Sequence, residues 1–436
     1  MNKWILGLIL VNMVVGARAQ QTVFNKLKKN RVVLPHGWAL TPAGHNLALR
    51  ELPRNMAVSS TGKYLAVTNN GQNAGALQLI DAEKERVLDA TGIPASCVGL
   101  KFSTDERFLY TSGGNANSIL KYEIVRSKLI LSDSIVPDKK WQGRIVPAGL
   151  DIDDKRQLLY VVTRQDHSLY VVDLAQKTFV QRFDLAGEGV SCLLSGNKEW
   201  LYILCRGSDK LYLFDTKTAR FAGTVAVGND PNDLCLTRDD RYLFVASNED
   251  HAVSVVDAGQ QKVIQTLNTA LFSGVPSGFA ANALALGADE KTLYIANADN
   301  NCLLVWDVSH PGSGLCKGFV PVGWFPVSVK LSGGKLFVAN GKGFSSLANG
   351  NTDPAHSGSP IRYHNGTNDW SKEVRYIVDL FTGSLSILDE PDNKLMGVYT
   401  QLVYQNCPYH RSTELSKQAT AETTTAVANQ SSVSMK

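Results

Sequence analysis

The stretch Arg241–Asp257 reads RYLFVASNEDHAVSVVD, and it decides the fold of this chain. Its two apolar runs, Tyr242–Ser247 and Ala252–Asp257, are separated by the polar loop Asn248–His251. Valine, phenylalanine and tyrosine favour a pleated, half-buried surface, and polar residues of this kind favour turns, so the stretch predicts a β-hairpin. A single hairpin cannot bury both of its faces, and the chain solves this by repeating the unit.

Each copy of the unit carries a leucine in the first strand of its hairpin, and this anchor recurs every 42–50 residues. The seven anchors are Leu65, Leu109, Leu159, Leu201, Leu243, Leu293 and Leu336. Apolar residues stand nine and seven positions before every anchor, which marks a further strand with one buried face. A β-only unit with this period is typical of a propeller with four strands per blade. The sequence therefore predicts an all-β, seven-bladed β-propeller.

One short segment predicts how the ring closes. Gly37–Thr41 has the pattern of a strand with no partner in its own repeat, and the seventh repeat lacks an outer strand after Asp389. We expect this N-terminal strand to complete the seventh blade, because closure removes free sheet edges that would invite aggregation.

The anchor strands also carry a family resemblance. YLAVTNN, YLFVASN, TLYIANA and KLFVANG resemble the YVTN-type propeller repeat, a bacterial and mostly extracytoplasmic seven-bladed family, over about residues 32–390. LPHGWALTPAG (34–44), VGWFPVSVKL (322–331) and LFTGSLSILDEP (380–391) are similar to the propeller half of bifunctional bacterial proteins, in which an alkaline-phosphatase-like phosphoesterase domain follows. That domain would need metal ligands and a hydroxyl nucleophile, and the 47 residues after Asp389 hold one histidine, so no phosphoesterase residue is carried over.

Composition outside the repeats defines the remaining segments. Lys3, the apolar Trp4–Val15 and Ala17–Ala19 predict a signal peptide cut after Ala19, and hence a periplasmic or secreted protein without a transmembrane segment. We expect a monomer. The predicted segments are a signal peptide (1–19), a basic leader forming a solvated arm (20–33), the propeller (34–391) with an insertion loop (341–383), a short linker or helix (392–410) and a disordered tail (411–436).

Charge and motifs exclude several function classes. The 436 residues have a net charge of +4 with no dense Lys/Arg cluster, so nothing indicates nucleic-acid binding. The sequence lacks GxSxG, HExxH, a phosphate-binding loop, CxxC and CxxCH, so it predicts no catalytic motif, no metal site and no cofactor. Cys192 and Cys205 could face each other across one hairpin, but two free thiols are favoured over a bridge, because cysteine in a strand acts as a small buried apolar residue.

The topology of a propeller gathers certain loops at one mouth of its central channel. Arg164 and Arg206 share one offset from their anchors, and His167 and His251 share another. Trp324 and Phe325 precede a strand of the seventh repeat and reach the same mouth. The candidate ligand-binding residues are Arg164, His167, Arg206, Asn248, His251, Asn297, Trp324, Asn340 and Lys342. Asparagine and aspartate are also what tight turns require, so these positions have an alternative, structural explanation.

Two functions of different class fit this pattern. The first is a noncatalytic propeller that binds a small anionic ligand or a protein partner. The second is an enzyme of the phosphogluconolactonase type, since lactonases share this architecture. The second function requires acid, arginine and histidine side chains at one place, and the candidates are Arg164, Arg206, His167, Glu249 and His251.

Overall fold

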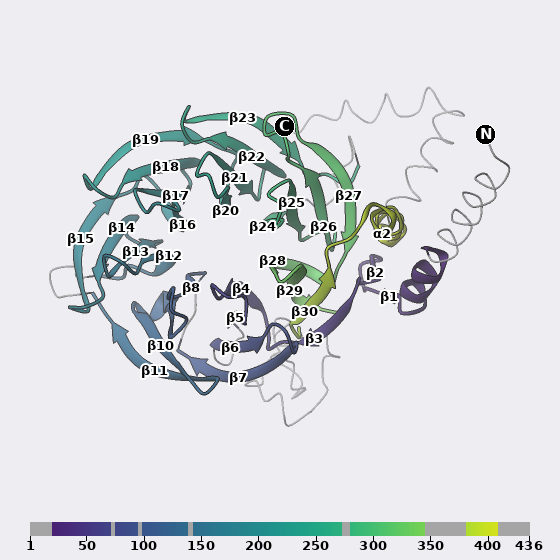
Figure 1. Ribbon diagram of the computed structural model, residues 1–436, viewed down its shortest axis with the longest axis horizontal. Helices are drawn as coiled ribbons and strands as arrows, with labels where there is room; N and C mark the ends of the chain where they lie inside the picture. Colours follow the sequence, from purple (N-terminus) through teal and green to yellow (C-terminus); the bar gives the residue numbers. More distant parts are fainter. Residues whose placement is uncertain are drawn as a thin grey trace, which may run out of the picture.

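The computed structural model shows seven four-stranded antiparallel sheets arranged as a ring around a central channel (Figure 1). It describes residues 20–70, 75–94, 98–137, 143–272, 280–344 and 381–408. The predicted all-β, seven-bladed propeller is confirmed. The first strand of each blade lies nearest the channel, and the following strands lie progressively further out.

Blades 1 to 4 each consist of four consecutive strands. In order from the channel outwards, blade 1 contains β4 (Pro53–Val58), β5 (Tyr64–Asn70), β6 (Gly75–Asp81) and β7 (Arg86–Ile93), and blade 2 contains β8 (Leu100–Phe102), β9 (Phe108–Ser112), β10 (Ile119–Val125) and β11 (Lys128–Ile135), with the 3₁₀ turn η1 (Gly114–Ala116) between β9 and β10. Blade 3 contains β12 (Pro147–Asp153), β13 (Leu158–Thr163), β14 (Ser168–Asp173) and β15 (Thr178–Asp184), and blade 4 contains β16 (Glu188–Leu194), β17 (Trp200–Arg206), β18 (Lys210–Asp215) and β19 (Arg220–Ala226).

Blades 5 and 6 repeat this order, whereas blade 7 joins the two ends of the propeller. Blade 5 contains β20 (Pro231–Leu236), β21 (Tyr242–Ser247), β22 (Ala252–Asp257) and β23 (Lys262–Asn268), and blade 6 contains β24 (Ala281–Leu286), β25 (Thr292–Asn297), β26 (Cys302–Asp307) and β27 (Leu315–Pro321). Blade 7 contains β28 (Trp324–Ser332), β29 (Lys335–Gly343), β30 (Ser384–Asp389) and, as its outermost strand, the N-terminal β3 (His45–Ala48).

The N-terminal strand closes the ring as expected, but the segment chosen for it was wrong. β3 pairs with β30, with His45 opposite Ile387 and Ala48 opposite Ser384. Within the predicted strand Gly37–Thr41, only β2 (Ala39–Leu40) is extended, and it pairs with β1 (Val32–Val33). Ala39 and Leu40 are each 1% exposed, and Leu40 packs in the apolar cluster that contains Phe319 and Trp324, so this segment is apolar because it is buried against the blades and not because it lies in one.

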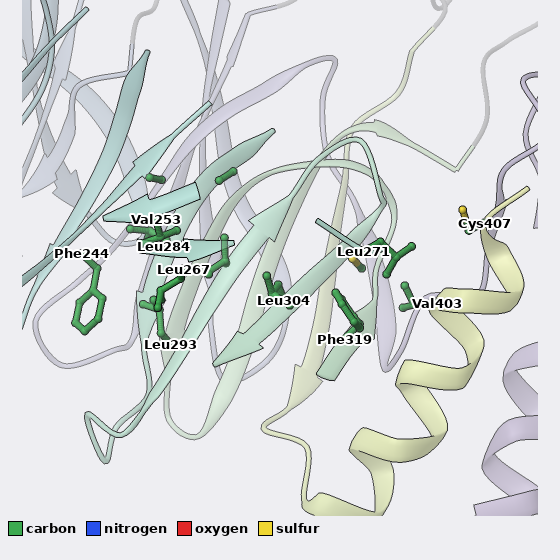
Figure 2. Close-up of a cluster of buried hydrophobic side chains, with 14 of the residues drawn as sticks. Phe244, Val253, Leu267, Leu271, Leu284, Leu293, Leu304, Phe319, Val403 and Cys407 are labelled. Atoms are coloured by element: carbon green, nitrogen blue, oxygen red, sulfur yellow. The ribbon is translucent and has the colours of Figure 1, made fainter. Parts of the chain in front are cut away.

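The seven anchor leucines form the centre of the apolar core. All seven are fully buried, and each packs between neighbouring sheets. Figure 2 shows such a cluster, in which Phe244 and Val253 of blade 5 meet Leu284 and Leu293 of blade 6. Burying a side chain of this size contributes roughly 1.5–3 kcal/mol, so the contacts between blades are a main source of the propeller's stability.

Two helices cover the outer side of blade 6. The helix α2 (Asn393–Asn406) packs on β27, where Thr400 Oγ1 accepts a 2.9 Å hydrogen bond from the backbone N–H of Phe319. A second helix, at residues 20–29, packs beside it through Val23, Phe24 and Leu27 (Figure 1). The basic leader 20–33 is therefore not a solvated arm. Its apolar side chains are spaced to face one side of a helix, and that side packs on the apolar cluster that includes Tyr399 and Leu402 of α2.

Several predictions concern residues outside the described parts of the chain. These are the signal peptide 1–19, the tail 411–436 and most of the insertion loop 341–383. Cys192 and Cys205 are both free thiols, with no disulfide between them. No helix in the described ranges has both the length and the apolar character needed to cross a membrane.

Candidate functional site

The innermost strands surround a central channel with a cavity volume of about 620 Å³. Asparagine side chains join these strands from blade to blade. Asn232 Nδ2 of β20 donates a 3.3 Å hydrogen bond to the carbonyl of Asn282 in β24, and Asn282 Nδ2 donates a 3.2 Å bond to the carbonyl of Pro326 in β28. Asn55 of β4 does the same with the carbonyl of Val98. The channel wall is thus polar, and part of its polarity serves to hold the blades together.

Charged side chains within the channel are mostly held by neighbours. Lys101 Nζ lies 2.9 Å from Asp151 Oδ1, and Asp151 is 1% exposed and also accepts a 2.9 Å bond from the N–H of Leu194 in the next blade. Asp233 accepts a 2.9 Å bond from the N–H of Leu284, and burial raises the pKa of this carboxyl although Lys330 counteracts the shift. These groups connect blades, whereas Arg54 and Lys330 also line the channel and have no carboxylate within ion-pair distance among the described residues.

Arg164 and Arg206 do share a role, as their equal offsets suggested, but each is bound to an acidic residue. Arg164 Nη2 lies 3.1 Å from Glu188 Oε2, and Arg206 forms an ion pair with Asp230. Glu188 and Asp230 both stand 13 residues before the anchor of the following blade. Each pair therefore joins one blade to the next at the channel mouth.

Asp230 extends this contact into a small network. Its second carboxylate oxygen accepts a 3.4 Å hydrogen bond from Asn248 Nδ2, and its backbone N–H donates a 3.2 Å bond to Asp209 Oδ1. Arg206 and Asn248 both line the channel. The structure therefore brings together two of the predicted site residues through a carboxylate that sequence reasoning did not single out.

His167 and His251 share a repeat position for a backbone reason. Both have left-handed backbone conformations (φ 47° and 56°), as do Asn117, Asp209 and Asn301 at the same offset in other blades. Histidine, asparagine and aspartate are the side chains that tolerate this conformation best. The shared position is thus explained by the turn between the second and third strands. Among the described residues, no group of three or more His, Cys, Asp and Glu could hold a metal ion.

Asn297 and Asn340 are buried structural amides. Both are 0% exposed. Asn297 Nδ2 donates a 2.7 Å bond to the carbonyl of Thr269, and Asn340 Nδ2 donates to Ser384 Oγ (3.1 Å) and Ser386 Oγ (2.9 Å). The amide of Asn297 thus holds the segment at Thr269, and the amide of Asn340 holds β30.

Trp324 and Lys342 lie together at the mouth end of blade 7, as predicted. Lys342 Nζ lies 4.4 Å from the ring centre of Phe325, 5.5 Å from that of Trp324 and 5.6 Å from that of Phe381. His36 and Phe381 each pack edge-on against Trp324, with ring centres 5.4 Å away. We call these five residues the aromatic cluster.

Burial shifts the pKa values of the two titratable groups in the aromatic cluster, Lys342 and His36. It lowers the pKa of Lys342, against a smaller opposing effect of Asp299. Partial burial and the charge of Lys342 lower the pKa of His36, which favours its neutral form. Sequence reasoning missed His36 and Phe381, because they stand far from Lys342 in the chain and outside the regular repeat.

The fold and the site define this chain as a seven-bladed β-propeller with a polar channel and an aromatic cluster at one mouth. No protein-family model matches the sequence. Uncharacterized protein YncE of Salmonella typhi is 27% identical over 157 residues, which cover 34% of this chain and 40% of that protein. Antigen Lp49 of Leptospira interrogans is 27% identical over 193 residues, covering 39% and 40%.

A third relative, the 6-phosphogluconolactonase of Klebsiella pneumoniae, is 23% identical over 164 residues, covering 36% of this chain and 48% of that protein. The chain thus spans less than half the length of each of these curated relatives. Among solved structures, U3-55K aligns with a TM-score of 0.58 at 14% identity (79% of this chain, 99% of that chain), and the Kuenenia stuttgartiensis hydrazine synthase with 0.56 at 18% (68% and 95%). At these identities the structural likeness shows the fold alone.

Proposed function

We propose that this chain is an exported, noncatalytic β-propeller that binds its ligand at the channel mouth. The observation that carries the proposal is how the charged side chains at the mouth are used. Arg164 and Arg206 are bound to Glu188 and Asp230, and the two histidines stand at turn positions. A hydrolytic site needs an acid or base that is free to move a proton, whereas these groups join blades.

The mouth retains features that suit binding. Arg206, Asn248 and Phe325 line the channel, and the carboxamide oxygen of Asn248 is buried without a hydrogen-bond partner. A buried polar atom left unpaired costs free energy, so a ligand that donates a hydrogen bond there would gain affinity.

The test combines a binding screen with a turnover assay on the same purified protein. We expect small anions to raise the melting temperature of the wild type, and we expect their contacts to map to the mouth by crystallography. We expect 6-phosphogluconolactone to hydrolyse at its spontaneous rate. Saturable hydrolysis above that rate, or ligands that bind only away from the mouth, would refute the proposal.

The alternative function is a lactonase of the 6-phosphogluconolactonase type. It is favoured by the partial similarity to the Klebsiella pneumoniae enzyme. It would require His167, His251 or Glu249 to act at one reacting centre. Turnover that is abolished by His251→Asn, a variant that keeps the left-handed turn, would support this alternative over the binding function.

The resemblance to phosphoesterase-linked propellers suggests a second aspect of the proposal, namely that this propeller accompanies a phosphoesterase domain. The gene sequence downstream of codon 436 tests this directly, since an in-frame phosphoesterase domain is the expected result. Export is tested separately by the mass of the protein recovered from the periplasm, which should correspond to a chain that begins at Gln20.

A further inference from the structure

Two paired strands bring the aromatic cluster together. β28 begins with Trp324 and Phe325, and β29 ends near Lys342. Trp324 lies opposite Gly343 and Pro326 opposite Asn340, with a register shift between the two pairs. Such a bulge leaves residues out of the regular pairing and can redirect side chains. Here the irregular segments include Phe325 and Lys342, whose side chains contact each other.

Phe325 is held in an unfavourable backbone conformation at this place. Its φ is 63°, in the left-handed region that a bulky L side chain rarely adopts. The conformation is stabilised by a 3.0 Å hydrogen bond from its N–H to Asn301 Oδ1 of blade 6. Because Phe325 also lines the channel, the strained residue connects the lysine with the cavity. Strain of this kind is commonly kept where a site must be shaped.

Lys342 differs from Arg164 and Arg206 at the mouth. Arg164 and Arg206 are each paired with a carboxylate, whereas no carboxylate lies within ion-pair distance of Lys342 in the described parts of the chain. The charged or titratable groups that act on Lys342 are Asp299, at longer range, and His36, whose neutral form is favoured. The aromatic faces offset part of its desolvation through cation–π attraction, but they supply no hydrogen-bond acceptor.

From this geometry we infer that Lys342 receives the anionic group of a small ligand whose aromatic body lies against Phe325 at the channel wall. This inference rests on the proposed function and adds to it the ligand class, an aromatic phosphate or carboxylate. A charge-assisted hydrogen bond to an ammonium is strong in a partly desolvated place, and an aromatic body would add ring contacts. An incoming anion would also favour the charged form of Lys342.

The first experiment measures binding of phenyl phosphate and benzyl alcohol to the full protein by isothermal titration calorimetry. We expect saturable binding of phenyl phosphate only, weakened about tenfold or more in Lys342→Met and largely kept in Lys342→Arg. Lys262→Met, which changes an exposed lysine in the outer strand β23, is the matched control and should bind as the wild type does. Melting temperatures of all variants establish that they are folded.

The second experiment observes the amine itself. Lysines are converted to ¹³C-dimethylamines, which keep their charge, and the signal missing from Lys342→Arg identifies Lys342. We expect phenyl phosphate to raise the pKa of this amine and to leave the chemical shift of the Lys262 signal unaffected. Equal affinity of wild type and Lys342→Met, or an unchanged Lys342 titration at saturating ligand, overturns the inference.

The outcomes separate this inference from the proposed function. If phenyl phosphate binds at the mouth but depends on Arg206 and not on Lys342, the binding function survives and the role of Lys342 fails. If the wild type hydrolyses lactones, the proposed function fails whatever Lys342 does. If benzyl alcohol binds as tightly as phenyl phosphate, the site recognises the ring alone and the anionic ligand class is wrong.

Discussion

Replacing Asp230 would remove the carboxylate that joins blades 4 and 5 at the channel mouth. Its side chain binds Arg206 of β17 and accepts a 3.4 Å hydrogen bond from Asn248 after β21. The backbone of Asp230 is left-handed (φ 52°), so alanine would introduce strain of its own. Asparagine tolerates this conformation, and Asp230→Asn is therefore the replacement that isolates the charge.

The exposure of the pair sets the expected magnitude. Arg206 and Asp230 side chains are 35% and 19% exposed, so solvent screens their attraction only in part. In a double-mutant cycle of Arg206→Met and Asp230→Asn we expect a coupling free energy of about 1–2 kcal/mol. Arg164 and Glu188 are 38% and 35% exposed, and the equivalent cycle should give about 0.5–1 kcal/mol.

Urea unfolding of the four proteins in each cycle, at low and high salt, measures these coupling energies. Both should fall with added salt, and the more exposed Arg164–Glu188 coupling should fall by the larger fraction. A coupling free energy below about 0.3 kcal/mol between Arg206 and Asp230 is what two sites that do not interact would give, and it would refute the reasoning. Arg206 would then be free to bind a ligand, and its assignment to the joint between blades 4 and 5 would be wrong.

Three further predictions concern the core, α2 and pH. Leu234 is 7% exposed between blades 4 and 5, and we expect Leu234→Ala to lower the unfolding free energy measured in urea by roughly 2–5 kcal/mol. A change under about half a kilocalorie would place Leu234 outside the core. Gly318→Ala would put a Cβ closer to Thr400 Oγ1 than van der Waals contact allows, so the variant should lose about 1–3 kcal/mol of unfolding free energy. The backbone amides of α2 should then exchange their hydrogens faster, and an unchanged exchange rate would show that Thr400 moves aside without loosening the helix. Because the pKa of Lys342 is lowered in the folded state, the unfolded chain binds one more proton than the folded chain at this site just below pH 10.5, so the stability of the wild type should rise with pH relative to that of Lys342→Met in that alkaline range. If the variant rises equally, burial does not perturb this amine.

The sequence predicted the repeat well, because each blade repeats the same burial pattern. The anchor leucines are fully buried in every blade, and that requirement is visible as a period. The closing strand was misplaced because β3, with the sequence HNLA, is mostly exposed and carries no alternation. Trp38 and Leu40 produced a strand-like pattern because both are buried in the apolar cluster that also contains Phe319 of β27 and Val403 of α2, and a single sequence does not tell which element buries them.

The candidate site was predictable where it followed the repeat. Arg164 and Arg206 were found because each stands at the same offset from the anchor leucine of its blade. Glu188 and Asp230 also share one offset from the anchor of the following blade, so the same comparison would have found them as well. The shared offset of the two histidines has a backbone explanation, because a left-handed turn selects His, Asn and Asp regardless of function. His36 reaches Trp324 only through the folded chain, so no local pattern could have indicated it.

A crystal structure of the protein soaked with phenyl phosphate would test the central claim most directly. We predict phosphate density within hydrogen-bond distance of Lys342 Nζ, with the ring against Phe325 and with Arg164 and Arg206 still bound to Glu188 and Asp230. Density for the anion on a released Arg164 or Arg206, or an unoccupied mouth beside ligand bound elsewhere on the propeller, would contradict that claim.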